Sequence, residues 1–299
     1  MEILESNVIS IDWGTSSFRA RELKSNGDIL KIISTDEGIL KSKDNFEKVL
    51  EKNLSTFTKN IPIIMSGMIG SKQGWFETKY LPLPCDSEVL ARNISKVSSC
   101  LGDIFIIPGL YKADTKFDVM RGEETEIIGA IHRLNIRNAS IVVTGTHSKV
   151  VTIKNGLIVD FNSYLTGEMF AALCKSSILG AFGNRVDIES EWFKLGVEVG
   201  YKSSNGGGLL NAIFQARSRV LVSDLPESYS ASFLSGVLIG AEIGASTYLD
   251  EIWIMGNGNL PMAYEKAFTY LNFKVSLVPD NTVIWGSLEV FNKYKEINK

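Results

Sequence analysis

The sequence predicts an α/β protein in which a mixed sheet flanked by helices is built twice. Two stretches, 8–33 and 140–161, share one order of apolar strand, Gly-Thr turn, second strand, Asn-Gly turn and third strand. After each stretch, strand and helix patterns alternate, and a strand meander followed by such alternation is typical of a mixed sheet with helices on both faces. A length of 299 residues suffices for two domains of about 150 residues, each with its own core.

Each repeat contains two kinds of turn. Asn26-Gly27 and Asn155-Gly156 separate alternating apolar runs, and they predict type I′ hairpins because this turn needs positive φ at both central residues. Gly14-Thr15 and Gly145-Thr146 instead follow an apolar strand and carry hydroxyl groups. A chain that builds the same hydroxyl-lined hairpin twice is able to hold a polyphosphate from two sides. The repeat therefore indicates a nucleotide-dependent enzyme.

The first half continues with helices and buried strands. Apolar residues at helical spacing predict a helix over 45–58. Buried strands are predicted in IPIIMSGM from Ile61 and in IFIIPGL from Ile104. Between them lie an irregular stretch over 67–85 and a predicted helix over 87–97. Another helix is expected to start near Glu123.

The second half contains more helices than the first. Strands are predicted in EIWIMGN and FKVSLV, and helices at 167–174, 190–199, 209–218, 261–271 and the C-terminus. One more helix, from Phe233, carries Gly236, Gly240 and Gly244 at every fourth position. These glycines leave a bare stripe on one helix face, which allows close backbone approach.

Composition and charge exclude several classes of function. An apolar content of 44% and a charged content of 22% are ordinary for a soluble globular protein, and a net charge of −3 offers no basic surface for nucleic acid. The stretch FLSGVLIGAEIGA carries Glu242 and is too short to span a bilayer, and the N-terminus has no signal-peptide pattern. Cys85, Cys100 and Cys174 are interpreted as reduced thiols, and two histidines exclude a His-rich metal site. We expect a cytoplasmic protein with no membrane or nucleic-acid partner.

The first Gly-Thr turn has the residue types of a phosphate site. Asp12 ends an apolar strand, where a carboxylate is costly unless a cation or donors satisfy it. Gly14 lets the backbone approach a ligand, and Thr15 and Ser16 offer hydroxyls and amides to phosphate oxygens. Mg²⁺ bound to ATP would bridge to the Asp12 carboxylate. The alternative is an aspartate that caps its own turn. No GxxxxGK[ST] is present and no GxGxxG follows a strand, which argues against a P-loop or Rossmann site.

Longer motifs carry a resemblance to a known family. The pair IDWGTSSFR and VTGTHSK resembles the two phosphate motifs of the sugar kinase, heat-shock ATPase and actin superfamily. More narrowly, the chain is similar to the 2-dehydro-3-deoxygalactonokinase family. Matching stretches cover the chain in the family's order: IDWGTSSFRA, IIMSGMIGSKQGW, YLPLP, IIPGL, DVMRGEETEIIGA, TGTHSK, YLTGE, FLSGVLIGAE and GNGNLPMAYEKAF. Thr144 and Val150 depart from the pattern of the second phosphate motif.

The resemblance implies a fold, a reaction and a division into domains. The fold is α/β with two similar ribonuclease-H-like domains, the actin-like ATPase fold, and an ATP cleft between them. Residues 1–135 would form an N-terminal sugar-acid and phosphate-binding domain, and residues 136–299 a C-terminal nucleotide-binding domain, with the option that the terminal helix packs back on the first. The reaction is ATP- and Mg²⁺-dependent phosphorylation of the 6-hydroxyl of 2-dehydro-3-deoxy-D-galactonate in galactonate degradation. In this superfamily a glycine-rich helix lies near the hinge, so the glycine stripe is expected to be the surface over which the halves close.

The acids before the helix at 123 are the candidates for catalysis. Phosphoryl transfer needs cationic groups and a carboxylate that orients or deprotonates the attacking hydroxyl. In the hexokinase branch an Asp-Thr pair supplies the base, and Glu124-Thr125 falls at the similar position. We therefore expect Glu124 as the base, Glu123 as the second choice, and Arg121 as the donor to the substrate carboxylate. The alternatives are a helix start enriched in acids and an ordinary surface arginine.

The loop 66–75 is the second candidate for binding the sugar acid. Ser66, Gly67 and Lys72 would hold its polar groups, and the indole of Trp75 would stack on it. The alternative for Trp75 is core packing.

The remaining candidates belong to the nucleotide. Lys149 either meets phosphate or is a solvated strand lysine, and His147 is interpreted as a turn residue. The resemblance makes Gly256-Asn257-Gly258 the adenosine-binding turn, with Leu260 and Tyr264 on the next helix. A plain strand-to-helix turn also explains these glycines.

Two other function classes stay open. One is a kinase for another sugar acid or an anhydro-amino sugar, because substrate identity depends only on 67–75 and 121–124. The other is a non-metabolic ATP-driven switch like the actin or chaperone branches. Against the switch, the chain has no separate peptide-binding domain and no long insertion for filament contacts. The sequence does not determine the oligomeric state, and a homodimer is left open.

Overall fold

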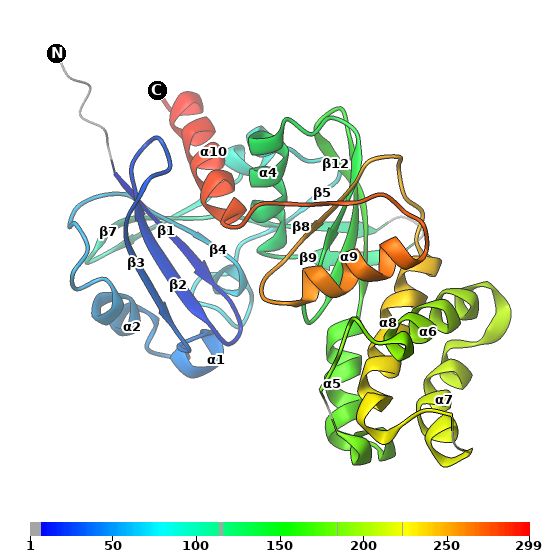
Figure 1. The fold of residues 1–299 in the computed structure, drawn as a ribbon. Helices are drawn as coiled ribbons and strands as arrows, with labels where there is room; N and C mark the ends of the chain where they lie inside the picture. The colour runs from blue at the N-terminus through cyan, green and yellow to red at the C-terminus, as the bar shows by residue number, and fades with distance from the viewer. Residues whose placement is uncertain (1–6, 114–115, 184, 223) are drawn as a thin grey trace. The chain divides into compact units, whose positions relative to one another are not determined.

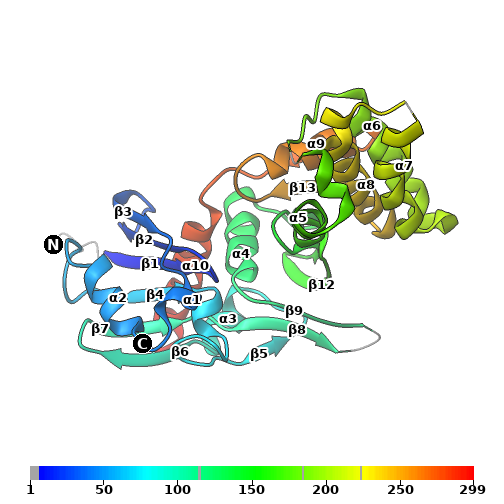
Figure 2. The same ribbon diagram turned by 90° about the horizontal axis from the view of Figure 1, so that it is seen from below.

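The chain divides into two compact units. The structure, a computed structural model, describes residues 7–113, 116–183, 185–222 and 224–299 (Figure 1, Figure 2). Unit 1 contains the described residues up to Arg137 together with Ile153–Asp160 and Asn281–Lys299. Unit 2 contains Asn138–Thr152 and Phe161–Asp280.

Unit 1 is built on a six-stranded mixed sheet with the order β3-β2-β1-β4-β7-β6. Its strands are β1 (Val8–Trp13), β2 (Phe18–Leu23), β3 (Ile29–Thr35), β4 (Ile63–Ser66), β6 (Ser95–Ser99) and β7 (Gly102–Ile106). β1 pairs antiparallel with β2 and parallel with β4, so that Asp12 lies beside Ser66. The polar residues that end β1 and β4 therefore reach the same edge of the sheet.

Helices cover both faces of this sheet, as the sequence predicted. They are α1 (Ile39–Ser42), α2 (Phe46–Asn53), α3 (Ser87–Arg92), α4 (Glu123–Leu134) and α10 (Thr282–Ile297). Ile9, Ile11 and Trp13 of β1 pack with Phe46 of α2 in one core cluster. The intervening Ser10 points the other way, because side chains alternate along a strand, and its hydroxyl donates to that of Ser287 in α10 (2.9 Å). α4 and α10 pack directly on each other.

Three of the sequence predictions for unit 1 need correction. IFIIPGL is not one strand: β7 ends at Ile106, and β8 (Gly109–Ala113) belongs to a small sheet with β5 (Tyr80–Pro82) and β9 (Phe117–Met120). Pro108 separates the two strands, and it has no N–H to donate to a ladder. The helices predicted over 87–97 and 45–58 end early, at Arg92 and Asn53, and the first of them is followed by β6. Pairing of β6 with β7 outweighs local helix propensity there.

The second sheet, most of which lies in unit 2, repeats the strand order. The order is β12-β11-β10-β13-β14, with β10 (Ala139–Val143), β11 (Ser148–Lys154), β12 (Leu157–Tyr164), β13 (Ile252–Met255) and β14 (Ser276–Leu277). The helices are α5 (Thr166–Ser176), α6 (Glu191–Lys202), α7 (Leu209–Val222), α8 (Ser230–Ala245) and α9 (Leu260–Tyr270). Both sheets therefore place the third, second and first strands of a meander beside a fourth, parallel strand. The predicted fold class is confirmed. No helix in the described ranges is long and apolar enough to cross a membrane.

The two Asn-Gly turns differ from each other. Asn155 and Gly156 both have positive φ, 54° and 79°, as a type I′ turn requires. In the first repeat only Gly27 does, at 88°, and its N–H donates to the carbonyl of Lys24 (3.0 Å). The Asn26 side chain instead bonds the backbone and side chain of Asp28. The prediction of a type I′ turn at Asn26-Gly27 is therefore wrong, because this local side-chain bonding favours a longer turn.

Glycines allow α6 and α8 to pack at short distance within unit 2. A Cβ on Gly240 would overlap the carbonyl oxygen of Val197, and Gly196 and Gly200 of α6 approach the backbone of α8 in the same way. The prediction that the glycine stripe is the surface over which two domains close is therefore wrong. Helix α6 of the same unit covers the stripe.

We expect Gly240→Ala to lower the free energy of unfolding by about 2 kcal/mol, because overpacking a close contact costs roughly 1–3 kcal/mol. Thermal unfolding measures the effect. The control is Lys194→Ala on the exposed side of α6, which should change stability by less than about 0.5 kcal/mol. Equal melting temperatures for the two variants would contradict this packing.

Candidate functional site

The first Gly-Thr turn is closed by its own backbone and held from behind by α1. The N–H of Gly14 donates to the carbonyl of Ser17 (2.9 Å). The N–H groups of Ile39 and Leu40 donate to the carbonyls of Gly14 (3.0 Å) and Thr15 (3.3 Å). A Cβ on Gly38 would overlap the backbone of Ser16. The turn is thus fixed, while Thr15 and Ser16 themselves stay exposed.

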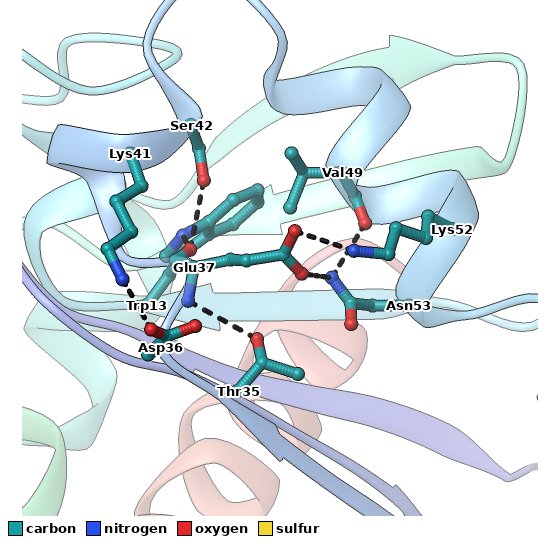
Figure 3. Close-up of polar contacts among 9 residues, drawn as sticks. All are labelled: Trp13, Thr35, Asp36, Glu37, Lys41, Ser42, Val49, Lys52 and Asn53. Carbon is teal, nitrogen blue, oxygen red and sulfur yellow. Dashed lines mark hydrogen bonds and ion pairs between the residues drawn. The ribbon is translucent and has the colours of Figure 1, made fainter.

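Glu37 fastens the segment behind the turn to its surroundings (Figure 3). Its carbonyl oxygen accepts from the indole N–H of Trp13 and from the hydroxyl of Ser42, both at 2.9 Å. Its carboxylate accepts from Lys52 (2.7 Å) and Asn53 (2.9 Å) of α2, and the bond from Lys52 is the main cause that lowers the pKa of Glu37. One residue therefore ties β1, α1 and α2 together beneath the turn.

The glycine after β4 brings three segments together in unit 1. Gly67 has φ 93°, and a Cβ there would lie 2.9 Å from the carbonyl oxygen of Trp13 and 3.4 Å from Oδ1 of Asp12. A Cβ on Gly122, itself at φ 107°, would lie 3.1 Å from Cα of Gly67. The Asp12 carboxyl, the loop after β4 and the start of α4 therefore meet at one point.

The carboxyl of Asp12 is partly buried. Burial raises its pKa, and Arg19 and Arg21 of β2 oppose that shift. Nη1 of Arg19 lies 3.4 Å from Oδ2 of Asp12. A carboxyl whose pKa burial raises gains from a nearby cation, so the residue fits a divalent ion that arrives beside it. In the part of the chain that the structure describes, no group of three or more His, Cys, Asp or Glu side chains is placed to hold a metal by itself.

Glu124 lies fully buried at the start of α4, with 0% of its surface exposed. Its Oε2 accepts from the N–H of Gly122 (2.7 Å), and its Oε1 accepts from the hydroxyl of Thr125 (3.2 Å). Burial, and then the neighbouring Glu123, raise the pKa of Glu124 to about 7. Glu123 accepts from the N–H of Arg121 (3.1 Å). Glu124 is therefore an acid whose pKa lies near neutral pH.

Arg121 is buried, and two of its three side-chain nitrogens already donate hydrogen bonds. Its Nη1 donates to the hydroxyl of Thr78 and its Nη2 to the Thr78 carbonyl (3.0 Å), while the guanidinium lies 4.1 Å above the ring of Tyr80. Its Nε has no protein partner, and neither do the buried hydroxyls of Ser66 and Ser71. Buried polar atoms without a partner are costly, so these three favour a polar ligand.

The other predicted residues of this loop differ in exposure. Lys72 is exposed, whereas Trp75 is partly buried and packs against the core of unit 1.

Two residues at this site were missed from the sequence. Glu126 lies near Asp12 and Glu123, and burial, followed by those two carboxylates, raises its pKa to about 8. Arg21 is buried, with its Nε and Nη1 unpaired and its Nη2 3.5 Å from Oδ1 of Asn281. The spacing of both residues in the sequence could have identified them. Arg21 follows Arg19 by two positions on a strand, and Glu126 follows Glu123 by three on a helix, so each shares a face with its neighbour.

The second Gly-Thr turn, in unit 2, is held in the same way as the first. The N–H of Glu168, in the first turn of α5, donates to the carbonyl of Thr146 (2.9 Å). A Cβ on Gly167 would overlap the carbonyl oxygen of Gly145. Nε2 of His147 lies 2.6 Å from the carboxylate of Glu168. Here too a glycine and a backbone N–H of the helix after the third strand fix the turn.

The structure brings this turn beside the predicted adenosine turn. Val143 of β10 pairs with Met255 of β13, and a Cβ on Gly256 would overlap the Thr144 hydroxyl. That hydroxyl is buried without a partner, and Asn257 is exposed. The two turns therefore share one edge of the sheet.

Lys149 follows the second turn and is buried. Its Nζ donates to the carbonyl of His147 (3.4 Å). The interpretation as a solvated strand lysine is therefore wrong.

An apolar cavity of about 450 Å³ opens beside the second turn within unit 2. Its walls come from α5, α8, α9 and the segment before α6, and they include Phe170, Ile188, Leu238, Leu260, Met262 and Tyr264. Ligand pockets of this size are mostly apolar with a few polar groups that orient the ligand. Leu260 and Tyr264, predicted from the sequence, lie in the wall.

Comparisons with known proteins agree on one family. A family model described as 2-keto-3-deoxy-galactonokinase matches residues 12–290. The chain is 30% identical over 292 residues to the Escherichia coli 2-dehydro-3-deoxygalactonokinase, covering 95% of this chain and 97% of that protein. It is 30% identical over 292 residues to the Rhizobium meliloti protein DgoK1, which is assigned the same activity, covering 93% and 94%.

Solved structures add the fold. A crystal structure of a Sinorhizobium meliloti protein assigned as 2-dehydro-3-deoxygalactonokinase superposes with a TM-score of 0.87 at 28% identity, covering 97% of this chain and 99% of that one. The activator of a 2-hydroxyisocaproyl-CoA dehydratase from Clostridium difficile reaches a TM-score of 0.52 at 14% identity, covering 98% and 97%. This second likeness shows a shared fold alone.

We expect Glu124 to make stability depend on pH. Its carboxyl has a pKa of about 7 when folded against an ordinary value of 4.5, so the folded state binds this proton more tightly. The tighter proton binding stabilises the folded state fully below pH 4.5. This stabilisation is lost as pH rises through 7, which lowers the free energy of unfolding by about 3 kcal/mol. Glu124→Gln removes this pH dependence of stability. The melting temperature of the variant, relative to that of the parent, should therefore rise between pH 5 and 8. A difference in melting temperature that stays constant over this range would contradict the assignment.

Proposed function

This chain belongs to the 2-keto-3-deoxy-galactonokinase family, and on that premise we propose that it transfers the γ-phosphate of ATP to the 6-hydroxyl of 2-dehydro-3-deoxy-D-galactonate. The observation that supports this most is the buried Glu124, whose pKa of about 7 suits a general base at neutral pH. Glu124 follows Gly122 by two residues, and Gly122 packs against Gly67, which in turn lies close to the Asp12 carboxyl. Family membership alone would not identify the base.

The two units divide the work in this proposal. The N-terminal part, proposed as residues 1–135, binds the sugar acid and part of the phosphate chain. The C-terminal part, proposed as residues 136–299, binds the nucleotide. Helix α10 belongs to unit 1 although it ends the chain.

Glu124 accepts the proton of the attacking hydroxyl. As the sugar oxygen forms a bond to the γ-phosphorus, the bond from that phosphorus to the β,γ-bridging oxygen breaks and ADP leaves. The proton passes from the 6-hydroxyl to the Glu124 carboxylate. Gly122 and Thr125 hold the carboxylate in place through both oxygens, which fixes the direction from which it meets the hydroxyl.

The first turn is proposed to contact the phosphates, and Asp12 would hold the metal ion. Thr15 and Ser16 offer hydroxyls, and Gly14 leaves room for phosphate oxygens close to the backbone. Bound Mg²⁺ would neutralise charge on the β- and γ-phosphates. Asp12, whose pKa burial raises and Arg19 and Arg21 lower, would hold that ion.

The second turn and the cavity bind the rest of ATP. Gly145, Thr146 and Lys149 are proposed to contact phosphate. Gly256, Asn257 and Tyr264 are proposed to contact the adenosine, whose base would occupy the cavity of about 450 Å³. A mostly apolar wall suits a planar base.

The buried polar atoms around Gly67 are proposed to bind the sugar acid. Arg121 offers its unpaired Nε to the carboxylate, with Ser66 beside it. Gly67, Lys72 and Trp75 complete the proposed contacts.

A substrate panel with ATP and Mg²⁺, followed by ADP release and product mass, tests the function. We expect 2-dehydro-3-deoxy-D-galactonate to be the preferred acceptor and Glu124→Gln to lower kcat by about two orders of magnitude with little change in KM, because only proton transfer is lost. Glu123→Gln is the matched control and should keep most of kcat. A different sugar acid as the best acceptor would replace the substrate assignment, and ATP turnover without any acceptor would favour a switch.

Removal of Arg121 should act on binding. We expect Arg121→Ala to raise KM for the sugar acid at least tenfold with a smaller effect on kcat, because a charged hydrogen bond to the carboxylate is lost. Arg121→Lys keeps the charge without the planar donors, so its KM for the sugar acid should rise less than that of Arg121→Ala. Arg92→Ala on the surface of unit 1 is the control. If a neutral hexose is phosphorylated as well as the acid, Arg121 does not bind a carboxylate.

A further inference from the structure

Unit 2 contains a buried carboxyl that none of these steps uses. Glu242 of α8 is only 3% exposed, and in the described part of the chain it forms no ion pair. Its Oε2 accepts from three hydroxyls: Ser148 Oγ at 2.5 Å, Tyr264 Oη at 2.6 Å, and Thr166 Oγ1. Its Oε1 is buried without a partner.

The three hydroxyls come from the three elements that build the nucleotide side of the site. Ser148 begins β11 directly after the second Gly-Thr turn. Thr166 begins α5 and precedes Gly167 and Glu168, which hold that turn from behind. Tyr264 lies on α9, and it lines the apolar cavity together with Thr166. One carboxylate oxygen thus connects the turn, its support and the cavity wall.

This arrangement is costly for stability alone. Burying a carboxyl without a cation is unfavourable, and burial raises the pKa of Glu242 while its hydrogen bonds lower it. An apolar side chain would pack in this last turn of a buried, mostly apolar helix without that cost. An apolar side chain at this position would also leave the three hydroxyl groups without their common acceptor. The carboxylate fixes the orientation of each hydroxyl through a hydrogen bond.

We propose that Glu242 is a positioning residue for ATP, which holds the second Gly-Thr turn at a fixed place against the wall of the nucleoside cavity. The inference rests on the proposed function in taking the ligand to be ATP. Glu242 acts through Ser148, Thr166 and Tyr264 and makes no contact with the nucleotide itself. Its loss should therefore weaken the binding of ATP and spare the binding of the sugar acid.

Unit 1 offers a matched control. Glu22 is buried to a similar extent, and it accepts from the hydroxyl of Thr58 (2.6 Å) and from its N–H (3.1 Å). Unlike Glu242 it also has a cation nearby, because Nζ of Lys31 lies 3.5 Å from its Oε2. It supports the segment after α2 and lies in neither Gly-Thr turn. Glu22→Gln therefore measures the cost of changing a buried glutamate, its ion pair included, away from the nucleotide.

The experiment measures Mg·ATP affinity by calorimetry without an acceptor, together with melting temperature. We expect Glu242→Ala to weaken affinity about tenfold, which corresponds to about 1.4 kcal/mol. The affinity of Glu242→Gln, which keeps one acceptor oxygen, should lie between those of Glu242→Ala and the parent. In both variants KM for the sugar acid should change less than twofold. Glu22→Gln should lower the melting temperature and leave ATP affinity unchanged.

A double-mutant cycle separates positioning from general stability. If Glu242 acts through Ser148, then Glu242→Gln combined with Ser148→Ala should bind ATP no more weakly than the weaker single variant. Additive losses, or a folded Glu242→Ala protein that binds ATP within twofold of the parent, would overturn the inference. A parent protein that binds ATP but does not phosphorylate the sugar acid would overturn the proposed function and leave this inference standing.

Discussion

Each Gly-Thr turn keeps its shape because the helix that follows the third strand presses on it through a glycine. In unit 1 the glycine is Gly38, which lies against Ser16, and in unit 2 it is Gly167, which lies against Gly145. Backbone N–H groups of the same helices donate to the carbonyl oxygens of the turns. Those carbonyls are therefore satisfied inside the protein, and the hydroxyls at the tip stay available. A side chain at either glycine would push the helix away and release the turn.

The strand order decides what stands next to each turn. In both sheets the first strand of the meander runs parallel to a strand from a later part of the chain. Parallel neighbours end at the same edge, so Asp12 lies beside Ser66 and Gly67, and Thr144 lies beside Gly256. The same topology thus assembles an acidic cluster in one unit and a turn with a cavity in the other. What differs is the side chains at that edge.

The two units hold their buried carboxyls by different means. In unit 1, Glu124 and Glu126 are close to further acids, and their pKa values rise to about 7 and about 8. Such groups exchange protons near neutral pH, which suits chemistry. In unit 2, Glu242 accepts hydrogen bonds from three neutral hydroxyls and forms no ion pair with another described residue. Such a group orients its partners, which suits positioning.

The sequence by itself determined the repeated meander, the Gly-Thr turns and the start of α4 at Glu123, because each depends on residues within a few positions of one another. It also carried the long motifs by which the family was identified. Only the tertiary structure decided that Pro108 divides two sheets and that α6 covers the glycine stripe of α8. It alone showed that Lys149 is buried, that Thr78 accepts from two of the three side-chain nitrogens of Arg121, and that Glu242 connects three elements. These features depend on contacts between segments far apart along the chain, and local pattern does not specify which distant backbone a glycine meets or which hydroxyls a carboxylate accepts.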